Sequence, residues 1–571
     1  MIKIVGSIAK SLSQFIGYWG YGDSETLTQQ LSKLLTQTPE SNWCVSLLPT
    51  SVELSADGIP HNSKNCNTQA DVWVQMAEHE LKLGRQAFGR VPLYWLQIEQ
   101  VIWFASRLQL LLPLITPKVS IPALYGYSCL SYVPTPLTPI AQIAALSAGT
   151  EQTWTNGMGK LLPPSAQSCL EWSEESYQID NEQEATRQLQ TLLKAAVERQ
   201  IADIGDETVG VFLSGGLDSS IVAALLVQAG VKVRAYTLDF GESAISEYPY
   251  AEQVAQWLKI PLVKVEATPR QLQQAQIHTI KALDLPFGDG VTVPLFLLNQ
   301  AASRDTRIIF NGEGGDQLFG GWTNKPLIAA SIYQSEHPDG NSFEAQYLST
   351  FHRLWGYEAQ VFQKSVYGEI EQINPQDWLY PALDDRSSSL LHRLRRASLM
   401  LKGAQNIHPR ATNLAFAHGL QVRSPFCDLP LAQWTFRLSG ELVLQGACEK
   451  YILKRAVDDW LPPEIVWRQK RGMGVPLTSW CLNQWWRELG IWLNPAILQA
   501  EGRWQPDLAA RIALGELGGK IQGRRIGEIL WLLIVWQLWR VQVLGDATVP
   551  PAWRYQFLLP YQFWRLAKQW R

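Results

Sequence analysis

The segment that most constrains this chain is residues 209–222, which read VGVFLSGGLDSSIV. A short apolar run at 209–213 ends at a turn with two adjacent glycines, and a pattern typical of an apolar helix follows directly and closes at Gly230. Residues 231–240 are a second strand-like run. This order predicts a βαβ unit whose turn lies at the carboxyl end of its first strand, where open parallel sheets bind their ligands.

The composition of this turn favours a bound polyphosphate. Adjacent glycines let several backbone N–H groups converge on one point, and the following helix adds the positive end of its dipole. Three serine hydroxyls add further donors, whereas Asp218 would repel a phosphate unless a cation such as Mg²⁺ bridges the two. The turn is neither a Walker A loop nor a GxGxxG loop. It resembles the pyrophosphate-binding loop of the ATP pyrophosphatase superfamily, whose members cleave ATP to AMP and pyrophosphate.

Composition narrows the class of protein and the ligands that it could bind. A chain of 571 residues with 46% hydrophobic and 18% charged residues is typical of a folded globular protein with about two to four domains. The formal charge of −3 gives no electrostatic footprint for nucleic acid. The seven cysteines are scattered singly and the eight histidines show no ligand spacing. We therefore expect reduced thiols, a cytoplasmic protein and no zinc site.

No signal peptide or transmembrane segment is expected. The first residues lack a basic region followed by an apolar one. The longest apolar run, Ile529–Trp536, is too short to span a bilayer and predicts a buried core helix. Many of the 25 tryptophans lie near the C-terminus, where core packing is favoured over a peripheral membrane or partner surface.

A second loop with candidate catalytic residues follows the strand-like run Ile308–Phe310. Residues 311–322 read NGEGGDQLFGGW, which places two carboxylates among glycines at the carboxyl end of a strand. A turn alone would not require Glu313 and Asp316 there. The segment is similar to the GEGxDExFGGY signature of asparagine synthetases, with glutamine at the family's second glutamate. The resemblance implies that Asp316 joins Asp218 in holding Mg²⁺, and that Glu313 is a candidate base for the attacking amine.

The resemblance continues through the second half of the chain. Residues 417–428 match the family's His-Gly-x-Glu-x-Arg-x-Pro-Phe-Leu-Asp segment, where we expect a structural ion pair between Arg423 and Asp428. Residues 449–474 match its Lys-x-Leu-Arg and Pro-x-x-Ile-x-x-Arg-x-Lys-x-Gly segments, which implies that Lys470 lies over the active site and stabilises charge on the α-phosphate. The implied ATP-binding residues are Leu213, Ser214, Gly215, Gly216, Asp218, Ser219, Ser220, Leu238 and Gly312.

The N-terminal part resembles the same family more weakly. Residues 85–94 and 104–107, RQAFGRVPLY and FASR, are similar to the later half of the family's glutamine amidotransferase domain, and a helix is expected after Ser106. A glutaminase of that class uses a cysteine at position 2 as its nucleophile. This chain has Ile2, and its first cysteine is Cys44. The domain is therefore predicted to be degenerate and unable to supply ammonia from glutamine.

The predicted fold class is α/β, with three parts. Residues 1–175 are predicted to form a degenerate Ntn-type glutamine amidotransferase-like α+β domain that ends in a linker at 161–175. Residues 180–545 are predicted to form a doubly wound parallel-sheet ATP pyrophosphatase domain. Residues 546–571 form a tail rich in Trp and Arg.

These parts predict an enzyme that uses ATP and Mg²⁺ to adenylate a substrate carboxylate, releases pyrophosphate, and lets an amine displace AMP to form an amide. Without a glutaminase, the amine is free ammonia or a group on the substrate. Relatives that lack the cysteine resemble β-lactam synthetase and the lasso-peptide macrolactam synthetases, which close rings within one molecule. Macrolactam closure of a lasso precursor peptide is favoured, and a precursor peptide and its leader protease are the expected partners.

Three alternatives stay open at this point. The first is an asparagine synthetase that uses ammonia or is nominally glutamine-dependent. The second is a β-lactam synthetase-like cyclase that acts on a small carboxylate. The third is a non-catalytic scaffold, which is disfavoured because Asp218, Glu313, Asp316 and Lys470 are all retained.

Overall fold

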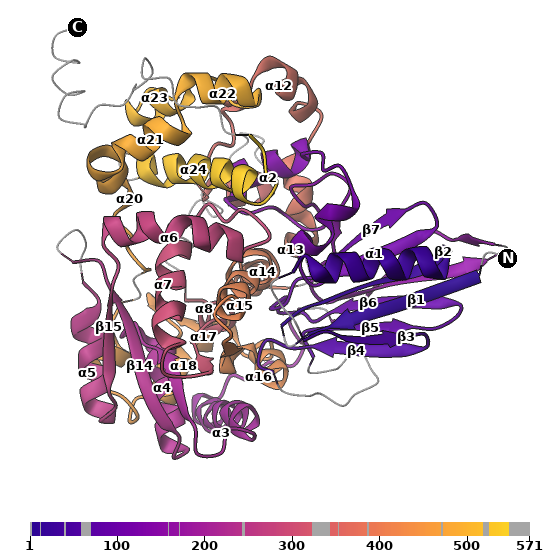
Figure 1. The fold of residues 1–571 in the computed structure, drawn as a ribbon. Coiled ribbons are helices and arrows are strands. Elements are labelled where there is room, and N and C mark those ends of the chain that lie inside the picture. The colour runs from indigo at the N-terminus through magenta and orange to yellow at the C-terminus, as the bar shows by residue number, and fades with distance from the viewer. Residues whose placement is uncertain are drawn as a thin grey trace, which may run out of the picture.

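The computed structural model describes residues 3–11, 13–38, 42–58, 70–157, 159–170, 172–241, 246–321, 343–351, 353–384, 388–469, 472–517 and 525–547. Figure 1 shows an N-terminal body of antiparallel strands beside a second body built on a parallel sheet. Helices from the C-terminal part of the chain form a layer along the second body (Figure 1). The overall class is therefore α/β, as predicted.

The N-terminal body is a sandwich of two antiparallel sheets. The first has the order β3-β1-β2-β8-β7-β9, and the second has the order β11-β10-β6-β5-β4 with β12 paired to β10. The strands are β1 (Lys3–Lys10), β2 (Phe15–Gly22), β3 (Cys44–Leu47), β4 (Thr50–Leu54), β5 (Val72–Met76), β6 (Glu80–Arg85), β7 (Tyr94–Ile98), β8 (Val101–Ala105), β9 (Ala144–Ala145), β10 (Thr150–Gly157), β11 (Lys160–Leu161) and β12 (Ser165–Ser168). Buried side chains from both sheets, including Trp19 and Leu81, share one core, so burial of apolar faces holds the layers together.

Two local expectations were wrong in this body. The segment after Ser106 forms two 3₁₀ turns, Leu108–Leu110 and Leu112–Leu114, and the helix α2 begins only at Ile121. Proline at position 113 lacks the N–H that a continuing helix needs. The expected linker at 161–175 is also partly ordered, because β12 pairs with β10 and extends the second sheet.

The second body is organised on a five-stranded sheet of order β15-β14-β13-β16-β17, in which every pairing is parallel. Its strands are β13 (Thr208–Phe212), β14 (Lys232–Asp239), β15 (Leu262–Glu266), β16 (Ile308–Phe310) and β17 (Gln421–Arg423). The predicted βαβ unit is present as β13, α4 (Leu217–Gln228) and β14. The two predicted loops therefore follow the neighbouring strands β13 and β16 at the same edge of the sheet.

Alternate residues of these strands pack into different cores, as a doubly wound sheet requires. On β16, Ile308 and Phe310 belong to a cluster with Ile221 of α4, whereas Ile309 belongs to a cluster with Phe296 of α7 (Thr292–Ala302). Helices thus cover both faces of the sheet (Figure 1).

The remaining helices belong to both bodies, and the first of them packs on β1 and β2 of the N-terminal body. They are α1 (Ser24–Thr36), α2 (Ile121–Leu130), α3 (Glu182–Ile201), α5 (Tyr248–Leu258), α6 (Pro269–Ala282), α8 (Gly315–Phe319), α10 (Phe343–Ser349), α11 (Glu358–Val361), α12 (Lys364–Ile370), α13 (Tyr380–Leu383), α14 (Leu390–Ala397), α15 (His408–Phe416), α16 (Leu429–Thr435), α17 (Gly440–Val443), α18 (Tyr451–Ala456), α19 (Pro463–Val466), α20 (Leu477–Ser479), α21 (Trp486–Trp492), α22 (Pro495–Glu501), α23 (Leu508–Ala513) and α24 (Ile526–Gln542). Two segments, Ser398–Ile407 and Trp480–Gln484, are π-helical.

The last described helix is longer than its apolar run predicted. By length and composition the segment Ile526–Leu544 could cross a membrane, but 78% of its most apolar window is buried inside the protein. Trp531, Trp536 and Trp539 are almost fully buried, which agrees with the expected core packing of the tryptophans in this helix. The tail from residue 548 onward lies outside the described residues.

Buried polar contacts join the two bodies. The Arg107 guanidinium donates to both carboxylate oxygens of Asp284 at 3.0 and 2.9 Å. The Arg85 guanidinium donates to the backbone carbonyls of Val91, Leu146, Gly89 and, across the interface, Ala404. Because these groups are withdrawn from water, separating the bodies would cost their hydrogen bonds as well as their apolar contact.

Candidate active site

The glycine turn after β13 has the conformation that its sequence requires. Gly215 has a φ of +70°, and a Cβ at this position would lie 2.5 Å from the backbone nitrogen of Ala251 in α5. Glycine is therefore required both for the backbone conformation and for the close approach of α5. The helix α4 begins at Leu217, so its first N–H groups face the turn. The Ser214 and Ser219 hydroxyl oxygens lie 3.2 Å apart, and their hydrogen bond joins the start of the turn to the first turn of α4.

The acidic loop after β16 packs directly against this turn. A Cβ on Gly312 would lie 2.7 Å from the Ser219 nitrogen, and one on Gly315 would lie 2.6 Å from the Asp218 carboxyl group. The absence of a side chain at Gly312 and Gly315 therefore allows the two loops to pack in direct contact. That contact brings Asp218 from one loop and Asp316 from the other to a common point.

A lysine lies between these two carboxylates. Lys450 Nζ is 2.7 and 2.5 Å from the carboxylate oxygens of Asp218 and 2.5 Å from Asp316 Oδ1. The lysine is only 2% exposed, and its φ of +57° is rare for a residue with a side chain. Backbone strain of this kind is found where surrounding structure fixes a functional group.

Our sequence analysis did not select Lys450, although it lies in the block that matched the family's Lys-x-Leu-Arg segment. The signal was present, since this lysine opens that match, but the cationic role was assigned to Lys470. Lys470 itself lies outside the described residues, so its position over the site stays a prediction.

The pair of carboxylates fits a divalent cation. Asp218 and Asp316 present hard oxygen ligands to one point, which already attracts the cation Lys450. Among the described residues, no cluster of three or more His, Cys, Asp or Glu side chains could hold a metal alone. Mg²⁺ at this point would therefore need oxygens from a polyphosphate to complete its ligands. When bound, it would neutralise polyphosphate charge.

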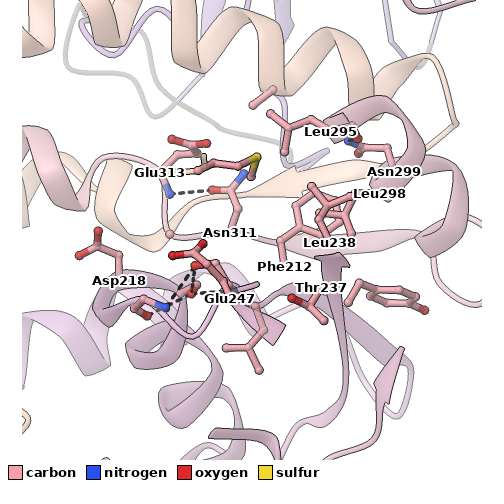
Figure 2. Close-up of a pocket in the computed structure, with 18 of the residues that line it drawn as sticks. Phe212, Asp218, Thr237, Leu238, Glu247, Leu295, Leu298, Asn299, Asn311 and Glu313 are labelled. Carbon is pink, nitrogen blue, oxygen red and sulfur yellow. Dashed lines mark hydrogen bonds between the residues drawn. The ribbon is translucent and has the colours of Figure 1, made fainter. Parts of the chain in front are cut away.

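A cavity of about 240 Å³ lies over the two loops. Figure 2 shows Leu238, Leu295 and Leu298 at one end and Asp218 and Glu313 at the other. The lining is Phe212, Leu213, Ser214, Gly216, Asp218, Ser219, Tyr236, Thr237, Leu238, Phe240, Ser246, Glu247, Leu295, Leu298, Asn299, Asn311, Gly312, Glu313, Asp316, Ala411, Val422, Met473 and Gly474. An apolar end for a base and a polar end for phosphates suit a nucleotide.

The structure brings most of the predicted site residues to this cavity. Among the predicted nucleotide and metal residues, all but Gly215 and Ser220 line it. Ser220 instead donates its hydroxyl to the Gly216 carbonyl at 2.8 Å and stabilises the first turn of α4. Gly215 forms the turn that abuts α5.

The position of Glu313 is fixed by its backbone. Its N–H donates to Asn311 Oδ1 at 3.1 Å, and the same oxygen accepts a hydrogen bond from the Ser424 hydroxyl at 2.8 Å. The Asn311 N–H in turn donates to the Arg423 carbonyl on β17 at 3.0 Å. The loop that carries Glu313 is thus anchored to the edge strand of the sheet.

A further residue that sequence reasoning missed is Arg468. Its guanidinium donates to the Gly215 carbonyl at 3.3 Å and to Glu247 at 3.1 Å, and it stacks 3.6 Å above the Tyr250 ring. Arg468 therefore holds the glycine turn from outside. It is the first cation of the matched segment that ends near Lys470.

The expected ion pair between Arg423 and Asp428 does not form. Arg423 binds both carboxylate oxygens of Asp203 at 2.7 and 2.8 Å, and Asp428 binds Arg199 at 3.0 and 2.8 Å. Arg199 lies on α3 and Asp203 lies just after it, so the two ion pairs fasten this helix to the sheet edge. The inferred structural role holds with different partners.

These features define a class before they define a family. A glycine turn after one parallel strand, an acidic loop after its neighbour and an apolar end of the cavity form a site that suits a nucleotide polyphosphate. The profile of the family described as Asparagine synthase matches residues 188–540, and that of the Glutamine amidotransferase domain matches residues 70–161. The chain belongs to the asparagine synthase family. It is a ligase that forms C–N bonds with ATP and releases AMP and pyrophosphate.

Individual relatives are distant. "Asparagine synthetase [glutamine-hydrolyzing] 1" of Bacillus subtilis is 22% identical over 81% of this chain and 75% of its own length. A "Putative asparagine synthetase [glutamine-hydrolyzing]" of Mycobacterium tuberculosis is 24% identical over 82% of this chain and 76% of its own length. Among solved structures, an NMN synthetase from Francisella tularensis is 16% identical, covers 38% of this chain and 92% of that chain, and has a TM-score of 0.20.

Proposed function

We propose that this enzyme forms an amide within one molecule, by macrolactam closure of a lasso precursor peptide. The observation that carries the proposal is the missing glutaminase nucleophile: residue 2 is Ile, and no cysteine precedes Cys44. Arg85, in the segment that resembles the family's glutamine amidotransferase domain, is occupied within the fold, because its guanidinium is buried against backbone carbonyls. An enzyme that makes an amide without this ammonia source takes its amine from elsewhere, and an amine on the substrate suffices.

In the proposed first step, the glycine turn binds the pyrophosphate portion of ATP through α4 N–H groups and serine hydroxyls. Asp218 and Asp316 would hold Mg²⁺ there. A substrate carboxylate attacks the α-phosphorus, the bond to the bridging oxygen breaks, and pyrophosphate leaves with the electron pair. Lys450 supplies fixed positive charge beside the atoms on which negative charge develops.

In the proposed second step, the peptide's N-terminal amine attacks the acyl carbon of the adenylate. The C–N bond forms, the C–O bond to AMP breaks, and the amine loses a proton. Glu313 lies on the cavity side of the acidic loop, so we assign it as the base that accepts this proton. A second candidate, an asparagine synthetase that uses free ammonia, has no observation that favours it over the cyclase.

The proposal includes partners and location. A precursor peptide is the substrate, and a leader protease supplies its free N-terminal amine. A cytoplasmic location is consistent with scattered cysteines and with a long apolar helix that is mostly buried.

The deciding experiment is ATP–pyrophosphate exchange with purified protein. Candidate precursor peptides are compared with aspartate plus ammonia, and Asp218→Ala serves as the inactive control. Exchange that requires a peptide, with a product lighter by one water, supports the cyclase. Exchange with aspartate alone replaces it with an asparagine synthetase. If none of these substrates supports exchange above the level of Asp218→Ala, both the cyclase and the asparagine synthetase are contradicted.

A further inference from the structure

A buried oxygen at the apolar end of the nucleotide cavity has no hydrogen-bond partner. Asn299, on α7, lines this cavity and is only 2% exposed. Its side-chain Oδ1 accepts no hydrogen bond from any residue that the structure describes. Buried polar groups are nearly always paired, because an unpaired one has lost its contact with water and gained nothing in return. An unpaired acceptor on the wall of a ligand cavity therefore indicates that the ligand brings the donor.

The hydrogen bond on the other side of this amide fixes which of its atoms is free. Asn299 Nδ2 donates to the backbone carbonyl of Leu295, one helical turn earlier, at 2.8 Å. A carbonyl oxygen accepts and cannot donate, so the amide nitrogen must face it and the two side-chain atoms cannot exchange places. The free atom is an acceptor, and Asn299 can recognise a ligand there only through a donor on that ligand.

The surroundings of this oxygen suit a base and not a phosphate. Asn299 shares α7 with Leu295 and Leu298, and Figure 2 shows these residues near Leu238, at the end of the cavity away from Asp218. The glycine turn, whose N–H groups suit phosphates, lies at the Asp218 end. A nucleotide with its phosphates on that turn therefore places its base beside Asn299, among apolar side chains that offer few other polar contacts.

The group at position 6 distinguishes adenine from the 6-oxo purines. Adenine carries an N6 amino donor where guanine and hypoxanthine carry an O6 acceptor. We propose that Asn299 Oδ1 accepts a hydrogen bond from the N6 amino group of ATP and selects ATP over nucleotides with an oxygen at this position. A 6-oxo base would set two acceptors against each other in a buried site, and a site built to hydrogen-bond a group rejects the analogue that lacks it. Asn299 is a specificity-determining residue of the adenylation step, whichever carboxylate is adenylated.

Nucleotide binding to the purified full-length protein tests this assignment. In the presence of Mg²⁺, the protein is titrated by calorimetry with ATP, ITP and purine riboside triphosphate, which carry an amino group, an oxygen and a hydrogen at position 6. The Kd for ATP should be about tenfold to a hundredfold lower than that for ITP, with purine riboside triphosphate between them. Equal Kd values for ATP and ITP overturn the proposal. The measurement needs no acyl substrate, so its result does not depend on macrolactam closure.

Substitution then assigns the discrimination to this side chain. Asn299→Leu removes the acceptor at similar volume and should bring the Kd values for ATP and ITP within about threefold of each other, chiefly by weakening ATP. Gln300→Leu, the same kind of change at the next and exposed position of α7, is the matched control and should keep the wild-type preference.

Two results with these variants overturn the proposal. One is a preference for ATP that Asn299→Leu retains, and the other is an equal loss of affinity for all three nucleotides, which would assign Asn299 a structural role alone. The thermal unfolding midpoint without nucleotide checks that each variant is folded. If Asn299→Leu does not fold, Asn299→Ala replaces it and should show the same loss of preference.

Discussion

The Lys450 ammonium lies 2.7 and 2.5 Å from the two carboxylate oxygens of Asp218, although 232 residues separate them in the chain. The contact ties the glycine turn to a residue in the left-handed backbone region at the start of α18. A buried cation held against two carboxylates is in place before any substrate arrives. Preorganised charge of this kind is usually the largest single contribution to stabilising a transition state.

Replacement of this lysine should therefore impair chemistry more than binding. We expect Lys450→Met to lower kcat for amide formation by about a hundredfold to a thousandfold. Lys232→Met is the control, because Lys232 lies on the exposed end of β14 and pairs only loosely, at 3.8 Å. Single-turnover measurement of product distinguishes the chemical step from substrate binding. A kcat for Lys450→Met within threefold of wild type would contradict the role.

The second prediction concerns the contact between the two loops. In Gly315→Ala the new Cβ would lie 2.6 Å from the Asp218 carboxyl group and would displace it. We expect pyrophosphate exchange to fall by about tenfold to a hundredfold, the cost of a small misplacement of a reacting group. Gly368→Ala in α12 is the matched change, since a Cβ there meets nothing within 4 Å. It should leave exchange unchanged and slightly raise the unfolding temperature.

The loops themselves could be predicted from the sequence because their composition has a local cause. The signal for each loop, which is glycines, serines and carboxylates directly after an apolar strand, lies within about a dozen consecutive residues. The parallel pairing of β13 with β16 was not predicted, because β14 and β15 lie between them in the chain and a local pattern does not give the order of strands in a sheet. Lys450 could not be placed, since its role depends on a left-handed residue that meets a turn more than two hundred positions earlier. The partner of Arg423 was also wrong, because ion pairing depends on how α3 docks and not on sequence proximity.

The third prediction concerns the buried link between the bodies. Asp284 is fully buried, and burial raises the pKa of its carboxyl group while Arg107 lowers it. Arg107→Met removes the compensating charge, which should destabilise the fold by about 3–5 kcal/mol near neutral pH. A raised carboxyl pKa in the folded state means that stability falls as pH rises through that value. The penalty should therefore shrink at acidic pH, where Asp284 becomes protonated in the variant.

Thermal unfolding of wild type and Arg107→Met at pH 5 and pH 8 checks this direction. The difference in unfolding midpoint should be larger at the higher pH. Arg107→Lys, which keeps the charge but not the paired geometry, should lie between them. A difference that does not change with pH would show that Arg107 contributes packing alone.

The fourth prediction follows from a histidine at the same interface. Burial lowers the pKa of His408 from 6.5 to about 4, and its Nδ1 lies 2.7 Å from the Phe88 carbonyl of the N-terminal body. Because the folded pKa lies below the unfolded one, the unfolded chain binds more protons between these values. Stability from the neutral ring is complete above pH 6.5 and is lost as pH falls toward 4. We expect the unfolding midpoint of wild type to drop across this window, and His408→Gln to reduce the drop.

The comparison is made by calorimetry at matched ionic strength, with His278→Gln as the control because His278 lies exposed on α6. An equal drop in wild type and His408→Gln would assign the acid sensitivity to other groups and reject His408 as its source.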